Sequence, residues 1–295
     1  MRIFLTGATG FIGSAIVPEL ISAGHEVVGL TRSDDGARAL EAAGAIAYFG
    51  TLEEPDSLRR GALESDGVIH TAFDHDFSRF VANCEKDGRV IAALGDALEG
   101  SDRPLLITSG TGMGNAEFGE LASEDVFNTS HPNPRIASEL AGQKLLEKGV
   151  NVSVVRLPQV HDTRKQGLIT PLIEIARDKG FAAYLGEGRN RWPAGHVSDV
   201  ARLYRLAAER AERGARYNAV AEEGIDARTI AEALGRGLGI PVKSLTAEEA
   251  PGYFGWMAMF AGMDFPASSA RTREKLDWHP SGPGLIADLD AMNYN

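Results

Sequence analysis

Short apolar runs alternate with helical patterns through the first half of the chain. The runs are continuous and rich in Val, Ile and Leu, which is typical of strands buried on both faces of a parallel sheet. Between them, apolar residues recur at helical spacing. We predict strands at Arg2–Thr6, Glu26–Thr31, Ala45–Phe49, Gly67–His70, Pro104–Thr108 and Asn151–Arg156, and helices at Phe11–Ala23, Asp34–Ala43, Pro55–Leu63, Ser78–Leu98 and Pro134–Lys148.

This alternation predicts right-handed βαβ units and therefore an α/β fold of the Rossmann type, with a doubly wound parallel sheet. After about Arg156 the alternation fails, and Gly, Pro and Trp become frequent. We divide the chain into a first domain over residues 1–160 and a smaller lobe over residues 161–295, interleaved with it in space. Further helices are predicted at Leu168–Lys179, Val197–Arg213, Asp226–Leu238 and near Arg271–Leu276.

The composition narrows the class of protein. Among 295 residues, 41 acids and 30 bases give a net charge of −11, which disfavours a nucleic-acid partner because such binding needs a basic face. The single cysteine, Cys84, excludes an intramolecular disulfide, and no His, Glu or Cys spacing indicates a metal site. The first residues lack the apolar region of a signal peptide, and no run is long enough to span a membrane. We therefore expect a cytoplasmic protein with no membrane partner.

The stretch RIFLTGATGFIG carries the strongest local signal. Apolar strand residues lead into Gly7, Gly10 and Gly13, and a helical pattern follows at once. The first glycine allows a tight turn, the second lets backbone N–H groups approach a pyrophosphate, and the third lets the helix pack closely on the strand. The anion would then meet the N-terminus of the helix. This context predicts that the first domain binds a dinucleotide.

The end of the second predicted strand bears on which dinucleotide is bound. An acid at this position would bind the ribose 2′-hydroxyl, but Thr31, Arg32 and Ser33 stand there. A guanidinium beside two hydroxyls suits a 2′-phosphate, so we favour NADP(H). NAD(H) remains possible, because Asp34 or Asp35 could serve a ribose and Arg32 could be a solvated turn residue.

Several stretches together resemble the extended short-chain dehydrogenase/reductase family, which is related to the NAD-dependent epimerases and dehydratases. The resemblance covers nearly the whole chain and rests on TGATGFIG, GTLEEPDSL, VIHTAF, LLITSGTGMG, VVRLPQVHD, HVSDVARLYRLAAE and RTREKLDWHPS, the last with Asp277 where the family has glycine. It implies a small-molecule substrate and a possible homodimer through the two long helices of the first domain. Besides the three glycines, Arg32 and Ser33, it implies cofactor contacts from Thr9, Phe11, Ile12, Thr51, Leu52, Thr71, Ala72, Phe73, Pro158 and Val160.

The segment NPRIASELAGQK departs from the family. The family's catalytic site is a Ser or Thr, a Tyr and a Lys, but Arg135 falls at the tyrosine and Glu139 at the lysine. No tyrosine occurs between Tyr48 and Tyr184, so a register error cannot restore one. The sequence thus resembles the atypical branch of the family. Arg135 could polarise a carbonyl or stabilise an oxyanion, or it could form an exposed i,i+4 ion pair with Glu139.

Other side chains could still take part in chemistry. Ser109 or Thr111, at a predicted strand end, could bind a substrate oxygen. His75 is flanked by two aspartates that could raise its pKa, which makes it a candidate proton donor. Further candidates for substrate contact are His131, His161, Trp192, Tyr253 and Trp256, the last two within an apolar stretch that could instead be core or subunit interface.

We therefore expect an NADP(H)-dependent oxidoreductase that acts on a carbonyl or alcohol of a small organic molecule without the usual Tyr/Lys pair. Hydride would come from the cofactor, so that the protein need only orient and polarise the substrate. One alternative is a catalytically silent NADP(H)-binding redox sensor or scaffold. A further alternative is an epimerase or lyase that uses nicotinamide transiently.

Overall fold

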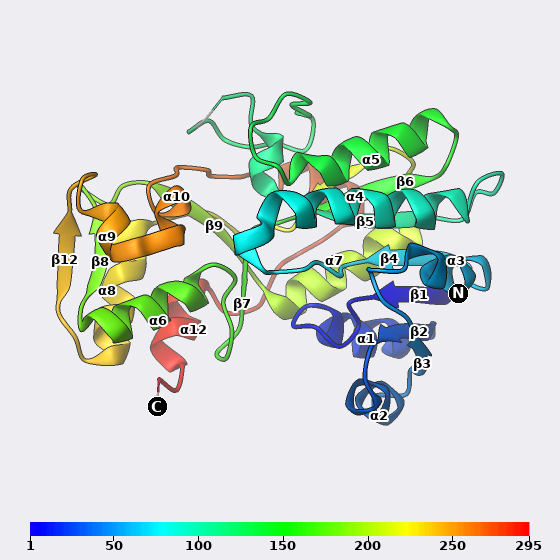
Figure 1. The fold of residues 1–295 in the computed structure, drawn as a ribbon, viewed down its shortest axis with the longest axis horizontal. Helices are drawn as coiled ribbons and strands as arrows, with labels where there is room; N and C mark the ends of the chain where they lie inside the picture. The colour runs from blue at the N-terminus through cyan, green and yellow to red at the C-terminus, as the bar shows by residue number, and fades with distance from the viewer. Residues whose placement is uncertain (118, 295) are drawn as a thin grey trace.

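The centre of the computed structural model, which describes residues 1–117 and 119–294, is a sheet of seven strands. Every neighbouring pair is parallel, and the order is β10-β6-β5-β4-β1-β2-β3 (Figure 1). The predicted Rossmann-type fold is confirmed. The strands are β1 (Arg2–Thr6), β2 (Glu26–Thr31), β3 (Ile46–Phe49), β4 (Gly67–His70), β5 (Leu105–Gly110), β6 (Val152–Leu157) and β10 (Arg216–Asn218).

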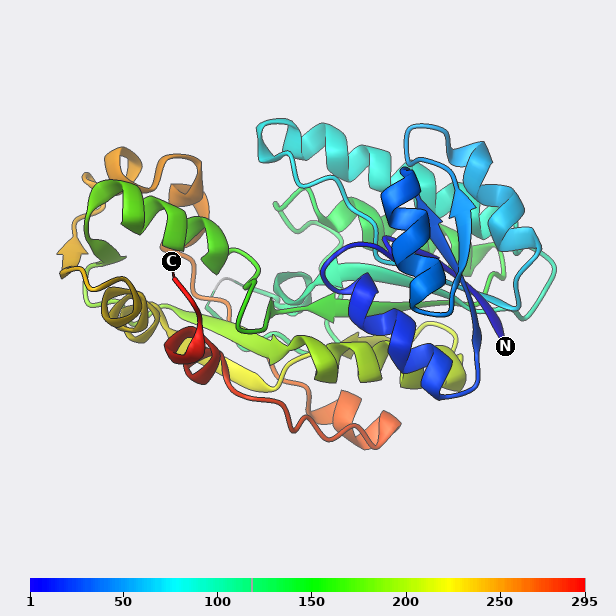
Figure 2. The same ribbon diagram turned by 90° about the horizontal axis from the view of Figure 1, so that it is seen from below.

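Helices cover both faces of this sheet. Along β1, Ile3 and Leu5 join the core on one face and Phe4 joins the core on the other, so a continuous apolar run is buried throughout. One face is covered by α1 (Gly13–Ser22), α2 (Asp34–Ala42) and α7 (Val197–Arg210), with α7 beside α1 (Figure 2). The other is covered by α3 (Pro55–Leu63), α4 (Phe80–Asp96) and α5 (Ile136–Glu147).

Local turns explain where these helices begin. The predicted start of α1 at Phe11 is two residues early, because residues before Gly13 form the turn that follows β1. The short 3-10 helix η1 (Phe77–Arg79) precedes α4. Before α5, the side-chain oxygen of Asn133 accepts the backbone N–H of Arg135 at 2.9 Å. None of the helices in the described part of the chain is long and apolar enough to cross a membrane.

The smaller lobe has its own core, which includes Ile173, Trp192 and Met257. The chain after residue 161 also returns to the large sheet, since it supplies α7 and β10. The lobe contains a sheet of β7 (Gln159–His161), β9 (Arg191–His196) and β11 (Glu222–Asp226), the pair β8 (Ala182–Leu185) and β12 (Val242–Leu245), and helices α6 (Ile169–Lys179), α8 (Ala227–Leu238), α9 (Ala250–Phe254), α10 (Ala258–Ala261), α11 (Ala270–Leu276) and α12 (Leu285–Ala291).

Candidate functional site

The glycine-rich turn lies where the strand order reverses, between β1 and β4. Gly7 has φ +72°, and a Cβ atom there would lie 2.7 Å from the Thr71 hydroxyl oxygen and 2.8 Å from the Ala72 nitrogen. A Cβ on Gly13 would lie 2.0 Å from the Gly7 carbonyl oxygen. Side chains at these positions would therefore disrupt the turn. In open α/β sheets, the ligand crevice forms at such a reversal of strand order.

Of the residues predicted to bind a 2′-phosphate, Arg32 is an exposed cation and Ser33 caps a helix. Arg32 is exposed and has no hydrogen bond or ion pair within residues 1–117 and 119–294. The Ser33 hydroxyl oxygen accepts the Gly36 N–H at 3.1 Å and caps α2, and Thr31 Oγ1 donates to the Ser33 carbonyl. Arg32 therefore keeps its donors for a ligand, whereas the hydroxyl of Ser33 already has a structural partner.

The remaining predicted cofactor residues lie around the same edge of the sheet. The Thr71 hydroxyl donates to the Thr6 carbonyl at 2.8 Å, and Thr51 Oγ1 accepts the Glu53 N–H at 3.3 Å. Val160 is buried in the core, so only its backbone could reach a ligand. Thr9 and Gly10 are exposed, and Phe11, Ile12, Leu52, Ala72, Phe73 and Pro158 are half-buried.

Arg135 is held in a fixed position just before α5. Its Nη1 donates to Asp87 Oδ2 at 2.6 Å and also to Ser138 Oγ, and its Nη2 donates to the Thr108 carbonyl at 3.1 Å. The guanidinium carbon lies 4.1 Å from the centre of the Phe73 ring. Its side chain is 15% exposed. These bonds use three of the five N–H donors of the guanidinium, which leaves donors for an oxygen at the crevice.

Asp87, on α4, joins Arg135 to a buried network beneath the sheet edge. Its second oxygen lies 3.0 Å from His70 Nε2, and His70 Nδ1 lies 2.6 Å from the Thr6 hydroxyl. The Ser138 hydroxyl also donates to Asp87 Oδ2 at 2.6 Å. Burial acts to raise the pKa of Asp87, but the charge of Arg135 and the bond from His70 outweigh it, so the pKa lies well below its ordinary value. Asp87 is therefore an anion that compensates Arg135.

Glu139 does not pair with Arg135, so the alternative of an exposed i,i+4 ion pair between them is wrong. Both Glu139 oxygens instead accept from the Arg156 guanidinium, at 2.8 and 2.9 Å, and Oε2 also accepts from Arg216 at 3.0 Å. The Glu139 and Arg156 side chains are fully buried. The physical reason is that Arg156 enters from β6 with a planar fork that matches a carboxylate in two bonds. Glu139 thus has its hydrogen bonds within the protein.

Ser109 and Thr111 both lie at the carboxyl end of β5. Ser109 is buried, and its hydroxyl has no hydrogen-bond partner among the described residues. Thr111 is also buried and begins the 3-10 helix η2 (Thr111–Gly114). Buried polar groups in folded proteins are usually hydrogen-bonded, so the unpartnered hydroxyl of Ser109 marks a position where a ligand oxygen could bind.

His75 follows β4, but the expected rise in its pKa is wrong. The residue is exposed, and its ring lies edge-on to Phe73 with centroids 5.4 Å apart. Desolvation by neighbouring protein, followed by the positive charges of Lys165 and Arg135, lowers the pKa below its ordinary value. Asp74 opposes this shift only partly. Asp76 instead accepts the Ser78 N–H and hydroxyl. His75 is therefore neutral at neutral pH.

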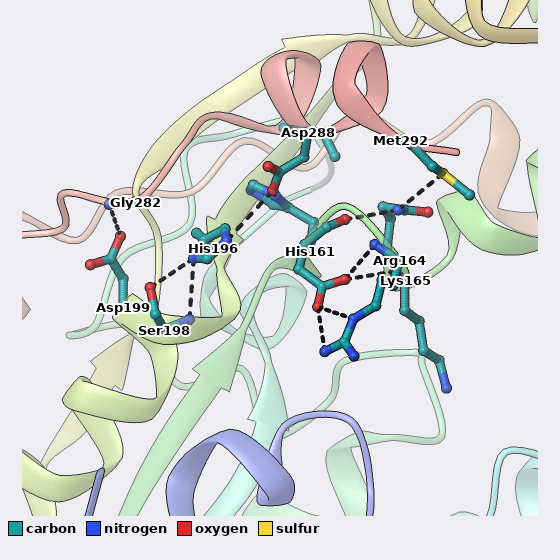
Figure 3. Close-up of polar contacts among 12 residues, drawn as sticks. His161, Arg164, Lys165, His196, Ser198, Asp199, Gly282, Asp288 and Met292 are labelled. Carbon is teal, nitrogen blue, oxygen red and sulfur yellow. Dashed lines mark hydrogen bonds and ion pairs between the residues drawn. The ribbon is translucent and has the colours of Figure 1, made fainter. Parts of the chain in front are cut away.

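His161 lies at the end of β7 beneath α12 (Figure 3). It is fully buried, and its Nδ1 lies 2.6 Å from Asp288 Oδ2. Asp288 also lies 3.7 Å from His196 Nε2. Burial lowers the pKa of His161, although Asp288 opposes the change. The Nε2 of His161 has no hydrogen-bond partner among the described residues, and its contact with substrate stays a prediction.

Of the aromatic residues predicted to contact substrate, two lie in the core and one lies at the surface. Trp192 is 2% exposed, and its indole N–H donates to the Met263 carbonyl at 3.1 Å. Tyr253 is buried and donates to the Phe181 carbonyl at 2.6 Å, and burial raises its pKa to about 12. Both line an apolar core cavity of about 20 Å³, which is smaller than a usual small-molecule site, and their contact with substrate stays a prediction. Trp256, by contrast, is 45% exposed.

Sequence reasoning missed Asp87, His70 and Arg156. Asp87 lies 48 residues before its partner Arg135 in the chain, so no local spacing connects them. One sequence signal could have indicated these residues. Each is a charged or polar residue within an otherwise apolar strand or helix face, and such a residue must have a polar partner when it is buried.

Comparison with known proteins places the chain among relatives of similar length. The model of the NAD-dependent epimerase/dehydratase family matches residues 3–220. An uncharacterized protein of Schizosaccharomyces pombe is 46% identical over 295 residues, which is 100% of both chains. The structure of Thermus thermophilus UDP-glucose 4-epimerase with NAD has a TM-score of 0.75 at 21% identity, covering 100% of this chain and 99% of that chain. A human epimerase family protein with NADPH has a TM-score of 0.72 at 20% identity, covering 100% of both chains.

Proposed function

Because the chain belongs to the NAD-dependent epimerase/dehydratase family, we propose that it is an NADP(H)-dependent oxidoreductase that interconverts a carbonyl and an alcohol. The observation that carries this proposal is the fixed guanidinium of Arg135 at the carboxyl edge of the sheet. The nicotinamide supplies the hydride when it is bound. The residues of this chain then have to bind, orient and polarise the substrate.

The residues of the first domain fit a dinucleotide. The turn at Gly7 and Gly13 has no room for side chains, and Gly10 is exposed beside it. The exposed guanidinium of Arg32, with no partner within the described ranges, supports a 2′-phosphate over a free ribose hydroxyl. The relatives that support a nicotinamide cofactor include one structure with NAD and one with NADPH.

Arg135 and Ser109 together would hold the substrate oxygen. Charge-assisted hydrogen bonds from a fixed guanidinium stabilise negative charge that develops on a carbonyl oxygen. Arg135 is suited to this because Asp87, Thr108 and the Phe73 ring fix its plane before substrate arrives. The unpartnered Ser109 hydroxyl would make the second bond to the same oxygen.

The proton requires another group, because Arg135 does not release one below a pH of about 12. His75 is the candidate we propose, because its ring lies edge-on to Phe73, the ring that the Arg135 guanidinium covers, and its lowered pKa leaves it neutral at neutral pH. A neutral imidazole accepts a proton from an alcohol, whereas it must first be protonated to assist carbonyl reduction. We therefore expect alcohol oxidation at neutral pH and faster reduction in mild acid.

Two observations favour a second candidate, an NADP(H)-binding protein without turnover. Asp87 already compensates the charge of Arg135, and the family's Tyr/Lys pair is missing. Such a site could bind cofactor and report its redox state without reducing a substrate.

The two candidates are tested by following the absorbance of pre-bound NADPH while a panel of aliphatic, aromatic and sugar-derived carbonyl compounds is added. Oxidation by one class supports the oxidoreductase, and tight binding without oxidation by any of them supports the sensor.

The variant Arg32→Ala tests the preference for NADP(H) over NAD(H). It should weaken NADPH by about tenfold or more and leave NADH nearly unchanged, since only NADPH carries the 2′-phosphate. Equal losses for both cofactors would contradict the NADP(H) assignment.

A further inference from the structure

Aromatic rings run from the candidate site to the smaller lobe. Phe73, on which the Arg135 guanidinium lies, is edge-on to Phe80 with ring centroids 6.4 Å apart. Phe80 contacts Phe77 at 5.6 Å. Phe77 in turn stacks on Trp256 in the 3-10 helix η3 (Gly255–Met257), with centroids 4.7 Å apart and ring planes inclined by 16°. The rings thus form a continuous wall across both parts of the molecule.

A surface hollow of about 440 Å³ lies against this wall. Its size falls within the range of about 300–1,000 Å³ that is typical of small-molecule sites. It opens between the first turn of α4 and α10, which face each other in both overall views (Figures 1 and 2). Its apolar lining is Phe77, Phe80, Val81, Ala82, Pro134 and Met259, and Pro134 directly precedes Arg135.

The lining leaves an unusual amount of apolar surface in water. Val81 is 57% exposed and Met259 is 55% exposed, and Trp256, which stacks on Phe77 of the lining, is 45% exposed. Single exposed apolar side chains are common, but several around one hollow indicate a binding surface. The charged residue in the lining is Arg79, and Ser78 adds a hydroxyl. A sugar nucleotide, with a diphosphate and many hydroxyls, would find few partners there, whereas a flat apolar molecule would be covered on both sides.

We propose that this hollow is the substrate site and that it takes aromatic or other flat apolar carbonyl compounds, not sugar nucleotides. The inference rests on the proposed function, since it names the substrate class of the same site. The apolar body of the substrate lies between Phe77 and Met259, and its carbonyl group points towards Arg135. The NAD-complexed relative acts on a UDP-sugar, as its name states, so this chain differs from that protein in substrate class.

Trp256 provides a direct readout of binding. Of the three tryptophans, Trp192 and Trp278 are buried in the cores, and Trp256 stacks on Phe77, which lines the hollow. The experiment measures tryptophan fluorescence of the full chain saturated with NADP⁺, which permits no carbonyl reduction, while naphthaldehyde or UDP-glucose is titrated in. We expect saturable quenching by naphthaldehyde and none by UDP-glucose at equal concentration. Trp256→Phe should abolish the response.

Variants assign the binding to the hollow. Phe77→Ala should weaken naphthaldehyde about tenfold, because the stacked wall is lost, and Met259→Glu should weaken it at an exposed position where folding is not at risk. Phe49→Ala removes an aromatic ring that is 56% exposed elsewhere and should change nothing. Tighter binding of UDP-glucose than naphthaldehyde, or wild-type affinity in both hollow variants, would overturn the proposal. Binding without later turnover with NADPH would instead contradict the oxidoreductase and leave this site intact.

Discussion

Two buried carboxylates, Asp87 on α4 and Glu139 on α5, are each paired with arginine, but the two ion pairs differ in their surroundings. Glu139 and Arg156 are wholly buried, and two of the three remaining N–H donors of Arg156 go to the carbonyls of Ser123 and Val126. Arg135 remains partly exposed and lies on an aromatic ring at the sheet edge. The same pairing chemistry therefore serves structure in one place and leaves donors for a ligand in the other.

The largest expected effect concerns the wholly buried pair. Glu139→Gln should lower the free energy of unfolding by about 3–5 kcal/mol, because Arg156 and Arg216 lose the carboxylate that compensates them. Denaturant unfolding followed by circular dichroism measures it. The double variant Glu139→Leu with Arg156→Met should recover most of the loss, since apolar residues can replace a buried ion pair. An unchanged unfolding midpoint in Glu139→Gln would contradict the structural role.

The next prediction tests whether the Ser109 hydroxyl serves the substrate site beside Arg135 or the structural ion pair of Arg156. Ser109 is in register with Arg156 on β6, yet it follows Thr108, whose carbonyl binds Arg135. Ser109→Ala should lower kcat by about 10²–10³-fold if the hydroxyl binds the substrate oxygen. It should not lower the free energy of unfolding, because that hydroxyl has no partner among the described residues. A loss of stability with unchanged kcat would assign Ser109 to the structural pair.

The pH dependence of the free energy of unfolding further distinguishes the pair of Asp87 and Arg135 from the wholly buried pair. The pKa of Asp87 is lowered in the folded protein, so the stability it contributes is present above the unfolded value of about 3.9 and is lost as the pH falls through the folded value. The wild type should therefore lose stability more steeply below a pH of about 4 than Asp87→Asn. Chemical unfolding at a series of pH values measures both slopes. Parallel curves would show that Arg135 does not hold Asp87 in its charged form.

A smaller effect concerns the charge around the crevice. Lys165 helps to lower the pKa of His75, after desolvation, so Lys165→Gln should raise that pKa towards its ordinary value. NMR titration of the His75 ring protons measures the change. Lys243→Gln, which removes a lysine that lies over Phe181, should leave it unaltered. An unchanged His75 pKa in both variants would place Lys165 too far from the site to matter.

Local patterns predicted the first domain well, because each strand and helix there is a continuous run with its own periodicity. The three glycines were predicted with their roles, and Gly7 and Gly13 indeed leave no room for a side chain. Asp277, which stands where the resemblance implies a glycine, has φ +50°, a backbone conformation that favours glycine.

Long-range contacts could not be predicted in this way. The partners Asp87 and Arg135, and likewise Phe77 and Trp256, are joined by the fold and not by local sequence. The strands of the smaller lobe are as short as three residues in β7, too short to show a period of two. Burial was also beyond local patterns, since Trp192 and His161 lie in the interior, and composition alone does not separate an interior aromatic from one in a pocket.

The central claim is that Arg135 takes part in the chemistry, and a single-turnover experiment tests it most directly. Wild-type protein, Arg135→Lys and Arg216→Lys are loaded with NADPH and mixed rapidly with naphthaldehyde. We predict that Arg135→Lys keeps its NADPH affinity but oxidises the cofactor about 10²–10³-fold more slowly, because a lysine cannot present the planar fork that Asp87 and Thr108 hold in place. Arg216→Lys, in the structural pair, should oxidise it at the wild-type rate. Equal rates in all three proteins would contradict the claim.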